Sequence, residues 1–524
     1  MMSNIYFRIL TISFIFSNLT TIESAKILGI FIIFSKSHHS VSQPIVKGLA
    51  ARGHEVTVVS HFKSSHTVPN YTEILLPEAN NFIDTIDIKS TQNYSDYYQY
   101  KKFLRELENS HCDHVLSLEF IKELIFSKEK TIDLIIGEIY FTQCYHLLAY
   151  TLNVPLILFL SPSLGEGVHY FVGNPCNPSF IPVKNTLYTT RMSFFERLDN
   201  AFQYSRNYWF QSFVINADTE RYAREVFKME PPSSEELNKK AALGFYNSHF
   251  SFIGRPMSPN AIEIGGIHIK ERKKLSKDLE DFIEGFAPGV IFFSFGTTIK
   301  ASSISSEKLK IIIDTFASIP QRVLWRVNEL NISESIPPNV KLGKWFPQRD
   351  ILEHKNVIGF ISHCGLLGTL EAVHTSTPVI GMPFSFDQFQ NANILAEKGA
   401  GIHVDYFTMT KYIFARAIEE IITNPKYREN MQKLSMVFKD RPRSPLDESL
   451  YWSEYVIKHQ GAPHLRTTAA DMPLYQYLLL DVLAVILGTA IGILCICKLL
   501  LRIGVRFSNY ITYTYLGKTK KTIR

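Results

Sequence analysis

Two hydrophobic patterns alternate along most of this 524-residue chain. Short runs of consecutive apolar residues, typical of strands buried in a parallel sheet, alternate with stretches of helical periodicity. In the first half the predicted strands are Lys26–Phe34, His54–Ser60, Asp133–Gly137, Pro155–Leu160, Val214–Ala217 and Phe252–Gly254. In the second half they are Gly289–Phe295, Val323–Arg326, Val340–Trp345, Val357–Ile361 and Pro378–Gly381. This alternation predicts an α/β fold with a doubly wound sheet in each half.

The helix expected after the first strand starts near Val41 and ends at Arg52, and a polar loop joins it to the strand. That loop holds Lys36-Ser37-His38-His39 instead of the G-x-G-x-x-G turn of dinucleotide-binding folds. In the second half, helices are predicted from Ser305 to about Phe316 and from Leu366 to His374, with two or three more before Gln460. The first strand end therefore favours chemistry on a substrate over dinucleotide binding.

A polar run, Glu271–Lys277, separates the two halves and has the composition of an exposed linker. We place the domain boundary there, with one domain over residues 26–275 and a second over residues 276–460. The irregular stretches of the first half contain many aromatic residues, as in Tyr94–Phe103 and Phe194–Phe210. They are candidates for the lining of an apolar substrate pocket, although helical core packing explains such residues equally well.

Apolar segments of different length lie at the two ends of the chain. Residues 1–25 place Arg8 before a short apolar run, as in a cleaved signal peptide. The run is well short of the ~20 residues that span a bilayer, whereas residues 482–502 are long enough. This candidate transmembrane helix follows a juxtamembrane segment, 461–481, and precedes a basic tail, 503–524.

Most of the positive charge lies in the tail. From Lys498 onward there are seven basic residues and no acidic ones, so the rest of the chain carries −1 rather than the +6 of the whole. No large basic surface for nucleic acid is therefore expected. Because basic residues favour the cytosolic side of a membrane, the tail is predicted to be cytosolic and the body lumenal, as in a single-pass type I protein. The closing KTKKTIR is similar to a dilysine retrieval signal of the endoplasmic reticulum.

The cysteines and sequons also indicate a secretory compartment. Cys112, Cys144 and Cys176 are candidates for a disulfide, but their spacing does not decide the pairing. Three Asn-x-Ser/Thr sequons predict glycosylation at Asn70, Asn93 and Asn331.

The stretch Phe360–Gln388 combines a strand end, a loop of small residues and a helix start. Unpaired N–H groups and the helix dipole make such a place an anion site. With other segments in the same order, it resembles the signature of the UDP-glycosyltransferases, which move a sugar from a UDP-sugar to small acceptors. The other matching segments are Ser37-His38, Phe293–Thr297 and Trp345–Gln348, the last followed by Asp350, Leu352 and His354.

The resemblance covers nearly the whole chain and implies a GT-B fold, two Rossmann-like domains facing across a cleft. It is to the membrane-bound animal members, and the SKSHH spelling points to an arthropod one. UDP-glucose is then the favoured donor and UDP-glucuronate the second, with transfer by inversion to hydroxyl groups of small lipophilic compounds. No cofactor or metal is expected beyond the UDP-sugar, and homo-oligomerisation is left open.

For the donor site, the resemblance implies contacts from the second domain. Trp345 is expected to stack on uracil, with Gln348 at the uracil edge and Glu371 at the ribose hydroxyls. Asp387 and Gln388 are expected to hold the sugar hydroxyls. The diphosphate contacts are expected from His363, from the backbone N–H groups of the following helix, and from Thr297 or Thr298. Ser294, Gly296, Gly365 and Gly368 are also expected in the UDP-sugar site.

Transfer to a hydroxyl also requires a base, and histidine suits that task because its ordinary pKa is about 6.5. The resemblance assigns the base to His38, with His39 as the neighbouring alternative. The carboxylate that orients it falls on Glu138, where the family usually has Asp, and Asp133 is the alternative.

Two further substitutions fall inside the signature. Cys364 replaces a glycine, at a cost on the order of 1 kcal/mol if the position has positive φ. It is also expected to crowd the diphosphate and to make the site thiol-sensitive. Leu367 stands where many members have Asn, which removes one phosphate donor. With Glu138, these changes leave a rival hypothesis, a non-catalytic relative that binds a lipophilic ligand or a nucleotide-sugar.

Overall fold

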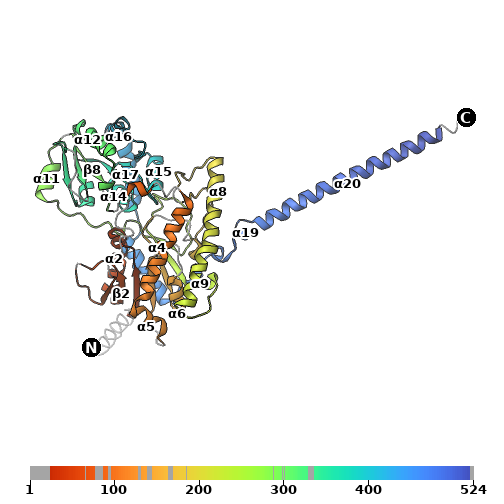
Figure 1. Ribbon diagram of the computed structural model, residues 1–524, viewed down its shortest axis with the longest axis horizontal. Coiled ribbons are helices and arrows are strands. Elements are labelled where there is room, and N and C mark those ends of the chain that lie inside the picture. Colours follow the sequence, from red (N-terminus) through yellow and green to blue (C-terminus); the bar gives the residue numbers. More distant parts are fainter. Residues whose placement is uncertain are drawn as a thin grey trace, which may run out of the picture. The chain divides into compact units, whose positions relative to one another are not determined.

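The structure is a computed structural model in which two parallel sheets carry the fold (Figure 1). It describes residues 24–64, 66–76, 87–91, 96–127, 131–138, 144–162, 169–183, 186–286, 288–297, 299, 301–327 and 335–519. The predicted signal peptide, apart from its last two residues, and the sequons at Asn93 and Asn331 lie outside this part. The chain forms two compact units, Met1–Thr467 and Thr468–Arg524, and the first contains both sheets.

The first sheet has seven parallel strands in the order β3-β2-β1-β4-β5-β6-β7. They are β1 (Lys26–Phe31), β2 (Glu55–Ser60), β3 (Tyr71–Leu75), β4 (Leu134–Glu138), β5 (Leu156–Leu160), β6 (Ala241–Tyr246) and β7 (Ala261–Glu263). The helices of this part are α2 (Lys36–Ala51), α3 (Ile88–Thr91), α4 (Tyr97–Ser117), α5 (Glu119–Phe126), α6 (Cys144–Leu152), α7 (His169–Val172), α8 (Phe194–Trp209), α9 (Asn216–Glu225) and α10 (Ser234–Asn238), with a π-helical segment η3 (Phe210–Ile215).

The second sheet has six parallel strands in the order β10-β9-β8-β11-β12-β13. They are β8 (Val290–Ser294), β9 (Arg322–Arg326), β10 (Val340–Gly343), β11 (Val357–Ser362), β12 (Val379–Gly381) and β13 (Gly401–His403). Its helices are α11 (Lys277–Ile283), η4 (Ala301–Ser303), α12 (Ser306–Ala317), α13 (Gln348–Leu352), α14 (Leu366–Thr375), α15 (Gln388–Glu397), α16 (Lys411–Thr423), α17 (Lys426–Lys439) and α18 (Pro445–Lys458).

Both sheets are buried on both faces, which explains the continuous apolar runs of their strands. In β1, Leu28 and Ile30 belong to one buried cluster, whereas Ile27 and Phe31 belong to the cluster on the other face. The strands of the second sheet alternate between two other clusters in the same way. The predicted doubly wound fold is therefore confirmed for both sheets.

The last helix of the second half returns to the first half. Leu450 of α18 belongs to a buried cluster of the first sheet, and Arg52 at the end of α2 donates a hydrogen bond to Glu454 at 2.8 Å. Gly48 of α2 faces this helix, because a Cβ there would lie 2.8 Å from Leu450 Cδ2. The domain boundary near residue 275 stays a prediction.

Four sequence predictions of local structure were wrong. The first helix begins at Lys36, five residues before the predicted start, so His38 lies in its first turn rather than in a loop. Residues 214–217 are helical, because a capping box at Ser193 and Glu196 opens a helix and no Gly or Pro interrupts the chain before Glu225. Residues 252–254 lie in turns rather than in a strand. Between Gln388 and Gln460 the chain forms four helices, α15 to α18, where two or three were predicted.

Four strands were missed, namely β3, β6, β7 and β13. β3 is a half-exposed strand at the edge of its sheet, and β7 and β13 have three residues each. β6 is buried throughout, but its sequence AALGFY begins with small residues of low strand propensity.

A disulfide joins Cys112 of α4 to Cys144 at the start of α6, which settles the pairing that the spacing left open. It links two helices of the first half across 32 residues of sequence. Stable disulfides form in oxidising compartments, so this bond agrees with the predicted lumenal body.

In the second unit, α20 (Leu480–Thr519) follows the short helices η6 (Thr468–Asp471) and α19 (Leu474–Tyr477). Its portion Leu480–Tyr515 is, by length and composition, the candidate membrane span among the described residues, and none of its most apolar window is buried. The helix is longer at both ends than the predicted span of residues 482–502.

Candidate active site

His38 and Glu138 lie together at the carboxyl edge of the first sheet. β1 and β4 are adjacent at the point where the strand order reverses, and such points are where α/β sheets bind ligands. His38 follows β1, and Glu138 is the last residue of β4. The Nδ1 atom of His38 is 2.7 Å from Oε1 of Glu138, and the Ser161 hydroxyl donates to the same oxygen at 2.6 Å.

The two alternatives from the sequence have other surroundings. His39 lies against the Phe62 ring, with the ring centroids 5.3 Å apart, and burial lowers the pKa of its imidazole. Asp133 precedes β4 at the opposite edge of the sheet, where it accepts a hydrogen bond from the Lys26 backbone. Of the four candidates, His38 and Glu138 are the pair that is hydrogen-bonded to each other in the described part of the chain.

The second sheet has a corresponding reversal between β8 and β11. Ser294 and Ser362 end these strands and are paired in register. Each serine hydroxyl accepts a hydrogen bond from the amide two residues on, Gly296 at 3.2 Å and Cys364 at 3.0 Å. Both of those residues have positive φ, +72° and +59°. The two loops thus make the same tight turn side by side.

His363 lies between these loops, where only glycines leave room for its ring. A Cβ at Gly296 would lie 2.4 Å from Cε1 of His363, and one at Gly365 would lie 2.6 Å from Nε2. Burial, aided by the nearby Arg326, lowers the pKa of His363 to about 4, so its imidazole is neutral near pH 7. Its Nδ1 atom is buried without a hydrogen-bond partner among the described residues.

The start of α14 is an open helix N-terminus. Gly365 is its N-cap residue and supplies no side-chain cap, and the first turn has no acidic residue. Its free N–H groups and the helix dipole favour an anion. Thr297 lies in the neighbouring turn, whereas Thr298 is outside the described residues.

Arg326 was not predicted as a site residue. It ends β9, beside β8, and its guanidinium donates hydrogen bonds to the carbonyl oxygens of Gly296 and, at 3.3 Å, Lys344. A cation therefore lies next to the anion site. The sequence did contain a signal for this placement, because Arg326 ends a predicted strand. The carboxyl ends of parallel strands meet at the same edge of a sheet, which is where the anion site lies.

Trp345, Gln348 and Glu371 form the next part of the site. Trp345 is 69% exposed, which is unusual for an indole and leaves its face available for stacking. Gln348, the first residue of α13, donates to Glu371 of α14 at 2.7 Å. Gly368 makes room for that amide, since a Cβ there would lie 3.0 Å from its nitrogen. Burial raises the pKa of Glu371 to about 7, against the opposing effect of the Gln348 hydrogen bond.

Asp387 and Gln388 begin α15 and are buried. The Gln388 side-chain oxygen accepts from the backbone N–H groups of Phe384 and Ser385, which holds the loop before it. Asp387 accepts from Asn391 at 3.2 Å, and the same amide donates to the carbonyl of Cys364 at 3.0 Å. The structure thus connects this pair to the loop of His363.

Cys364 has the positive φ that the sequence analysis considered, but its side chain is placed differently from the expectation. It is fully buried in an apolar cluster, and its Sγ faces Gly381, where a Cβ would lie only 2.6 Å away. The thiol therefore points into the core rather than toward the anion site. Burial also raises the pKa of the thiol far above its ordinary value, so sensitivity to thiol reagents is not expected at this residue.

Leu367 also has a packing role. It lies on α14 yet packs against an apolar cluster of the first sheet, and its carbonyl oxygen is 3.2 Å from Nε2 of His268. The residue that replaces a polar one in the signature thus joins the two halves of the chain.

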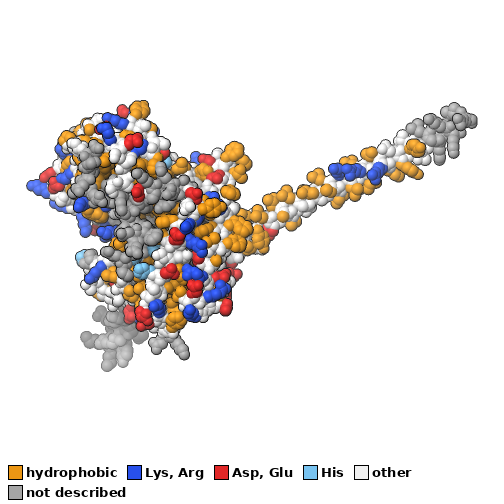
Figure 2. Space-filling view, in the orientation of Figure 1, with side chains coloured by type: hydrophobic (Ala, Val, Ile, Leu, Met, Phe, Trp, Pro, Cys, Tyr) orange, Lys and Arg blue, Asp and Glu red, His pale blue; other side chains and the backbone are white. Residues whose placement is uncertain are grey.

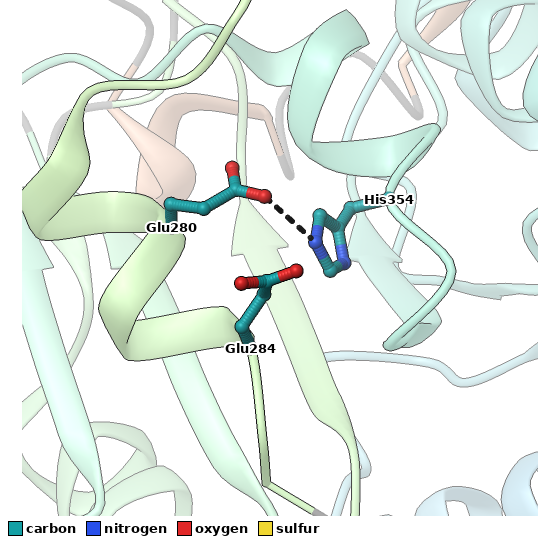
Figure 3. Close-up of side chains that lie close together, drawn as sticks. All are labelled: Glu280, Glu284 and His354. Atoms are coloured by element: carbon teal, nitrogen blue, oxygen red, sulfur yellow. Dashed lines mark ion pairs between the residues drawn. The ribbon is translucent and has the colours of Figure 1, made fainter.

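Among the described residues, one group of side chains has the spacing of metal ligands. Atoms of Glu280, Glu284 and His354 lie within 4.8 Å of one another (Figure 3). The Asn356 N–H donates to Nδ1 of His354 at 3.1 Å, so Nδ1 holds the lone pair and Nε2 carries the proton. That proton is directed at Glu280, 3.4 Å from Nε2. In this tautomer no ring nitrogen is available to a metal, and an ion pair or hydrogen bond explains the group.

Comparison with known proteins identifies relatives over most of the chain. The family model described as "UDP-glucoronosyl and UDP-glucosyl transferase" matches residues 25–510. The chain is 35% identical over 487 residues to UDP-glucosyltransferase 2 of Dactylopius coccus, across 92% of this chain and 94% of that protein. It is 32% identical over 491 residues to UDP-glucuronosyltransferase 2B7 of Homo sapiens, across 88% and 91%.

Two solved structures share the fold. A "glycotransferase of kitacinnamycin" matches with a TM-score of 0.52 and 15% identity, over 83% of this chain and 99% of that one. A spinosyn forosaminyltransferase matches with a TM-score of 0.56 and 14% identity, over 83% and 100%. At such identities the likeness concerns the fold alone, and it confirms the predicted GT-B architecture.

Proposed function

The chain belongs to the UDP-glucuronosyl and UDP-glucosyl transferase family, and from that premise we propose that it transfers glucose from UDP-glucose to hydroxyl groups of small lipophilic acceptors. The contact between His38 and Glu138 carries the proposal, because it provides a base at the sheet edge. Glucose is favoured over glucuronate because a relative at 35% identity is named a glucosyltransferase, whereas the human glucuronosyltransferase described above is 32% identical.

In the proposed donor site the second sheet holds UDP-glucose. Trp345 stacks on uracil, Gln348 binds the uracil edge, and Glu371 accepts from the ribose hydroxyls. Asp387 and Gln388 bind the sugar. The diphosphate lies at the open start of α14, where His363 and the Arg326 cation add to the backbone N–H groups. Donors fixed in advance around developing charge are each worth on the order of 3 kcal/mol. These groups can stabilise departing UDP without a metal.

In the proposed reaction, His38 takes the proton of the acceptor hydroxyl. Its Nδ1–H donates to the Glu138 carboxylate, which leaves the lone pair on Nε2. As the acceptor oxygen attacks the anomeric carbon, the bond to the UDP oxygen breaks and His38 becomes an imidazolium paired with Glu138. A single direct displacement inverts the anomeric centre.

Glu138→Gln should lower kcat much more than it raises the KM for UDP-glucose. An amide cannot stabilise the imidazolium as a carboxylate does, so the loss should fall in the chemical step. Steady-state kinetics with varied donor measures both constants. Glu263→Gln is the matched control, because Glu263 also ends a strand of this sheet and accepts from a serine, Ser248. Near-normal kcat in Glu138→Gln would remove Glu138 from the mechanism.

The affinity for UDP-glucose should rise with pH through the range set by Glu371. Its pKa of about 7 means that this carboxyl group is protonated in the free enzyme below pH 7 and must lose its proton for both oxygens to accept hydrogen bonds from the ribose. The donor KM should therefore fall about tenfold from one pH unit below that pKa to one above. Glu371→Gln should bind more weakly but with a flat profile. An unchanged slope in that variant would assign the titration elsewhere.

We also propose that the chain is a single-pass type I protein of the endoplasmic reticulum membrane, with its body in the lumen. The candidate span at Leu480–Tyr515, the basic residues beyond Lys498 and the Cys112–Cys144 disulfide support this topology. Asn70, in the exposed turn before β3, is accessible for glycosylation. Protection of the body from protease in sealed microsomes, together with digestion of the tail, is the test.

A further inference from the structure

The long helix formed by α8 and η3 has its polarity reversed. A helix on a protein surface normally turns its apolar side inward and its polar side to solvent. Here the buried side chains include Asn200, Tyr204, Asn207 and Gln211. The outward side carries large apolar residues, which we call the outer stripe: Phe194, Phe195, Leu198, Phe202, Trp209 and Phe213, each between 58% and 76% exposed. Figure 2 shows apolar side chains gathered in the region of α8.

The outer stripe lies on one side of the helix. At the helical repeat its α8 members fall within an arc of about 100°, the width of an ordinary core-facing side. The Trp209 and Phe213 rings stack with centroids 5.0 Å apart. A continuous exposed apolar surface of this kind indicates contact with an apolar partner.

The stripe cannot turn inward, because hydrogen bonds fix the opposite side. The Asn200 amide donates to the carbonyls of Pro178 and Ile181 at 2.7 and 2.9 Å, and its oxygen accepts from the Val183 N–H at 2.7 Å. Rotation of the helix would break all three bonds and leave their polar groups buried without partners. The exposure of the stripe is therefore built into the fold.

Neighbouring groups of the protein engage the charged residues of α8, although the Arg197 side chain is exposed. The Arg206 guanidinium lies 3.4 Å from the centroid of the Tyr97 ring, and Arg197 donates to the Met192 carbonyl at 2.7 Å. Asp199 accepts from the Tyr188 hydroxyl at 2.7 Å, and Glu196 closes the capping box. Because these groups are occupied within the protein, recognition by the stripe is apolar rather than electrostatic.

The stripe is also near the place where the chain leaves the first unit. Thr467, the last residue of that unit, donates to the Gly173 carbonyl at 3.0 Å, and Arg466 donates to the Phe171 carbonyl at 2.8 Å. Pro178, which is bonded to Asn200 of α8, is five positions after Gly173. At ~3.6 Å per residue, the exit point is within about 18 Å of that bond. The candidate span begins at Leu480, thirteen residues beyond Thr467.

We propose that the outer stripe inserts into the interfacial layer of the membrane that holds the C-terminal helix, so that the body has a second, peripheral membrane contact. The proposal rests on the membrane anchorage stated under Proposed function. Phe and Trp rings on one side of a helix suit this layer, where they bury apolar area at headgroup depth. The short tether keeps the stripe at high effective concentration beside the bilayer. Because the charged groups of α8 are bonded within the protein, neutral lipid is sufficient for this contact.

The test uses Trp209 as a reporter in the full-length chain, reconstituted in phosphatidylcholine vesicles with or without brominated acyl chains. The Trp209 signal is the difference between the emission of wild type and that of Trp209→Phe. Brominated lipid should remove more than half of this signal, acrylamide in the water should remove little of it, and added salt should change neither result. The control is Trp345, 69% exposed on the second half, which acrylamide should quench and brominated lipid should not.

Other outcomes overturn the proposal in distinguishable ways. Quenching of Trp209 by acrylamide alone places the stripe in water, and protection from both quenchers places it against protein, such as a second copy of the chain. Equal lipid quenching of both tryptophans indicates unspecific adsorption. A chain that does not float with the vesicles contradicts the anchorage as well. The variant Phe195→Ser/Phe202→Ser, whose changes are on exposed side chains, should fold and restore acrylamide access to Trp209.

Discussion

Replacing His38 by alanine should lower kcat for glycosyl transfer by about 10²–10⁴-fold, the usual contribution of a positioned base. The KM for UDP-glucose should change little, because His38 belongs to the first sheet and the proposed donor contacts to the second. Without the imidazole the acceptor hydroxyl must lose its proton to water, while the departure of UDP is still assisted. Release of UDP and formation of product, measured with microsomes that carry equal amounts of each variant, give the two constants.

His39→Ala is the matched control. Its ring lies against Phe62 and is separate from the pair of His38 and Glu138, so most of the activity should remain. A loss as large as that of His38→Ala would place the base on His39. Activity retained in both variants would exclude a histidine base in this loop.

Gly296→Ala should raise the KM for UDP-glucose by at least about tenfold, because a Cβ at this position would lie 2.4 Å from the ring of His363. The ring has little room to move, since Gly365 approaches it from another side. Displacing His363 would also disturb Arg326, which is bonded to the Gly296 carbonyl. Calorimetry with UDP measures the loss of affinity without requiring turnover.

Gly285→Ala separates the effect of the clash from that of backbone strain. Gly285 has a φ of +69°, almost that of Gly296, but a Cβ there would meet no atom within 4 Å. Both variants should lose roughly 1 kcal/mol of stability from the left-handed conformation. UDP affinity should fall in Gly296→Ala alone. Equal affinities in the two variants would show that the glycine is needed for the turn and not for His363.

Much of the fold could be predicted because strands buried on both faces produce continuous apolar runs. Where that signal was weak the prediction failed. β6 begins with Ala-Ala, and the edge strand β3 is half exposed. Val214 and Ile215 have the composition of a strand, but the helix that begins at Ser193 continues through them. The strand propensity of these two residues was outweighed by the continuous helix on either side of them.

The candidate site could be placed from the sequence because its residues occur in a fixed order of motifs, and the roles of those residues stay predictions. The sequence placed His38 and Glu138 at the ends of two strands, and the order β2-β1-β4 brings them within 2.7 Å. The orientation of Cys364 could not be predicted. A residue in the loop can face the anion site or the core, and the space beside Gly381 admits its thiol to the core.

Residues outside the motifs were harder to find. Arg326 reaches the proposed donor site because β9 lies beside β8 in the sheet, a neighbour relation that periodicity does not predict. The exposed stripe of α8 was predicted as core packing or pocket lining, since an apolar side of a helix usually faces inward. The burial of its polar residues and the hydrogen bonds of Asn200 identify which side faces inward.

The most direct test incubates microsomes that carry the chain with UDP-glucose and a mixture of phenols and alcohols, followed by mass detection of products. Acceptors should gain one hexosyl unit with release of an equal amount of UDP, UDP-glucuronate should be a poorer donor, and microsomes with His38→Ala should yield almost no product. A wild-type chain that binds UDP-glucose yet forms no product with any acceptor or donor would contradict glycosyl transfer and leave a binding protein in its place.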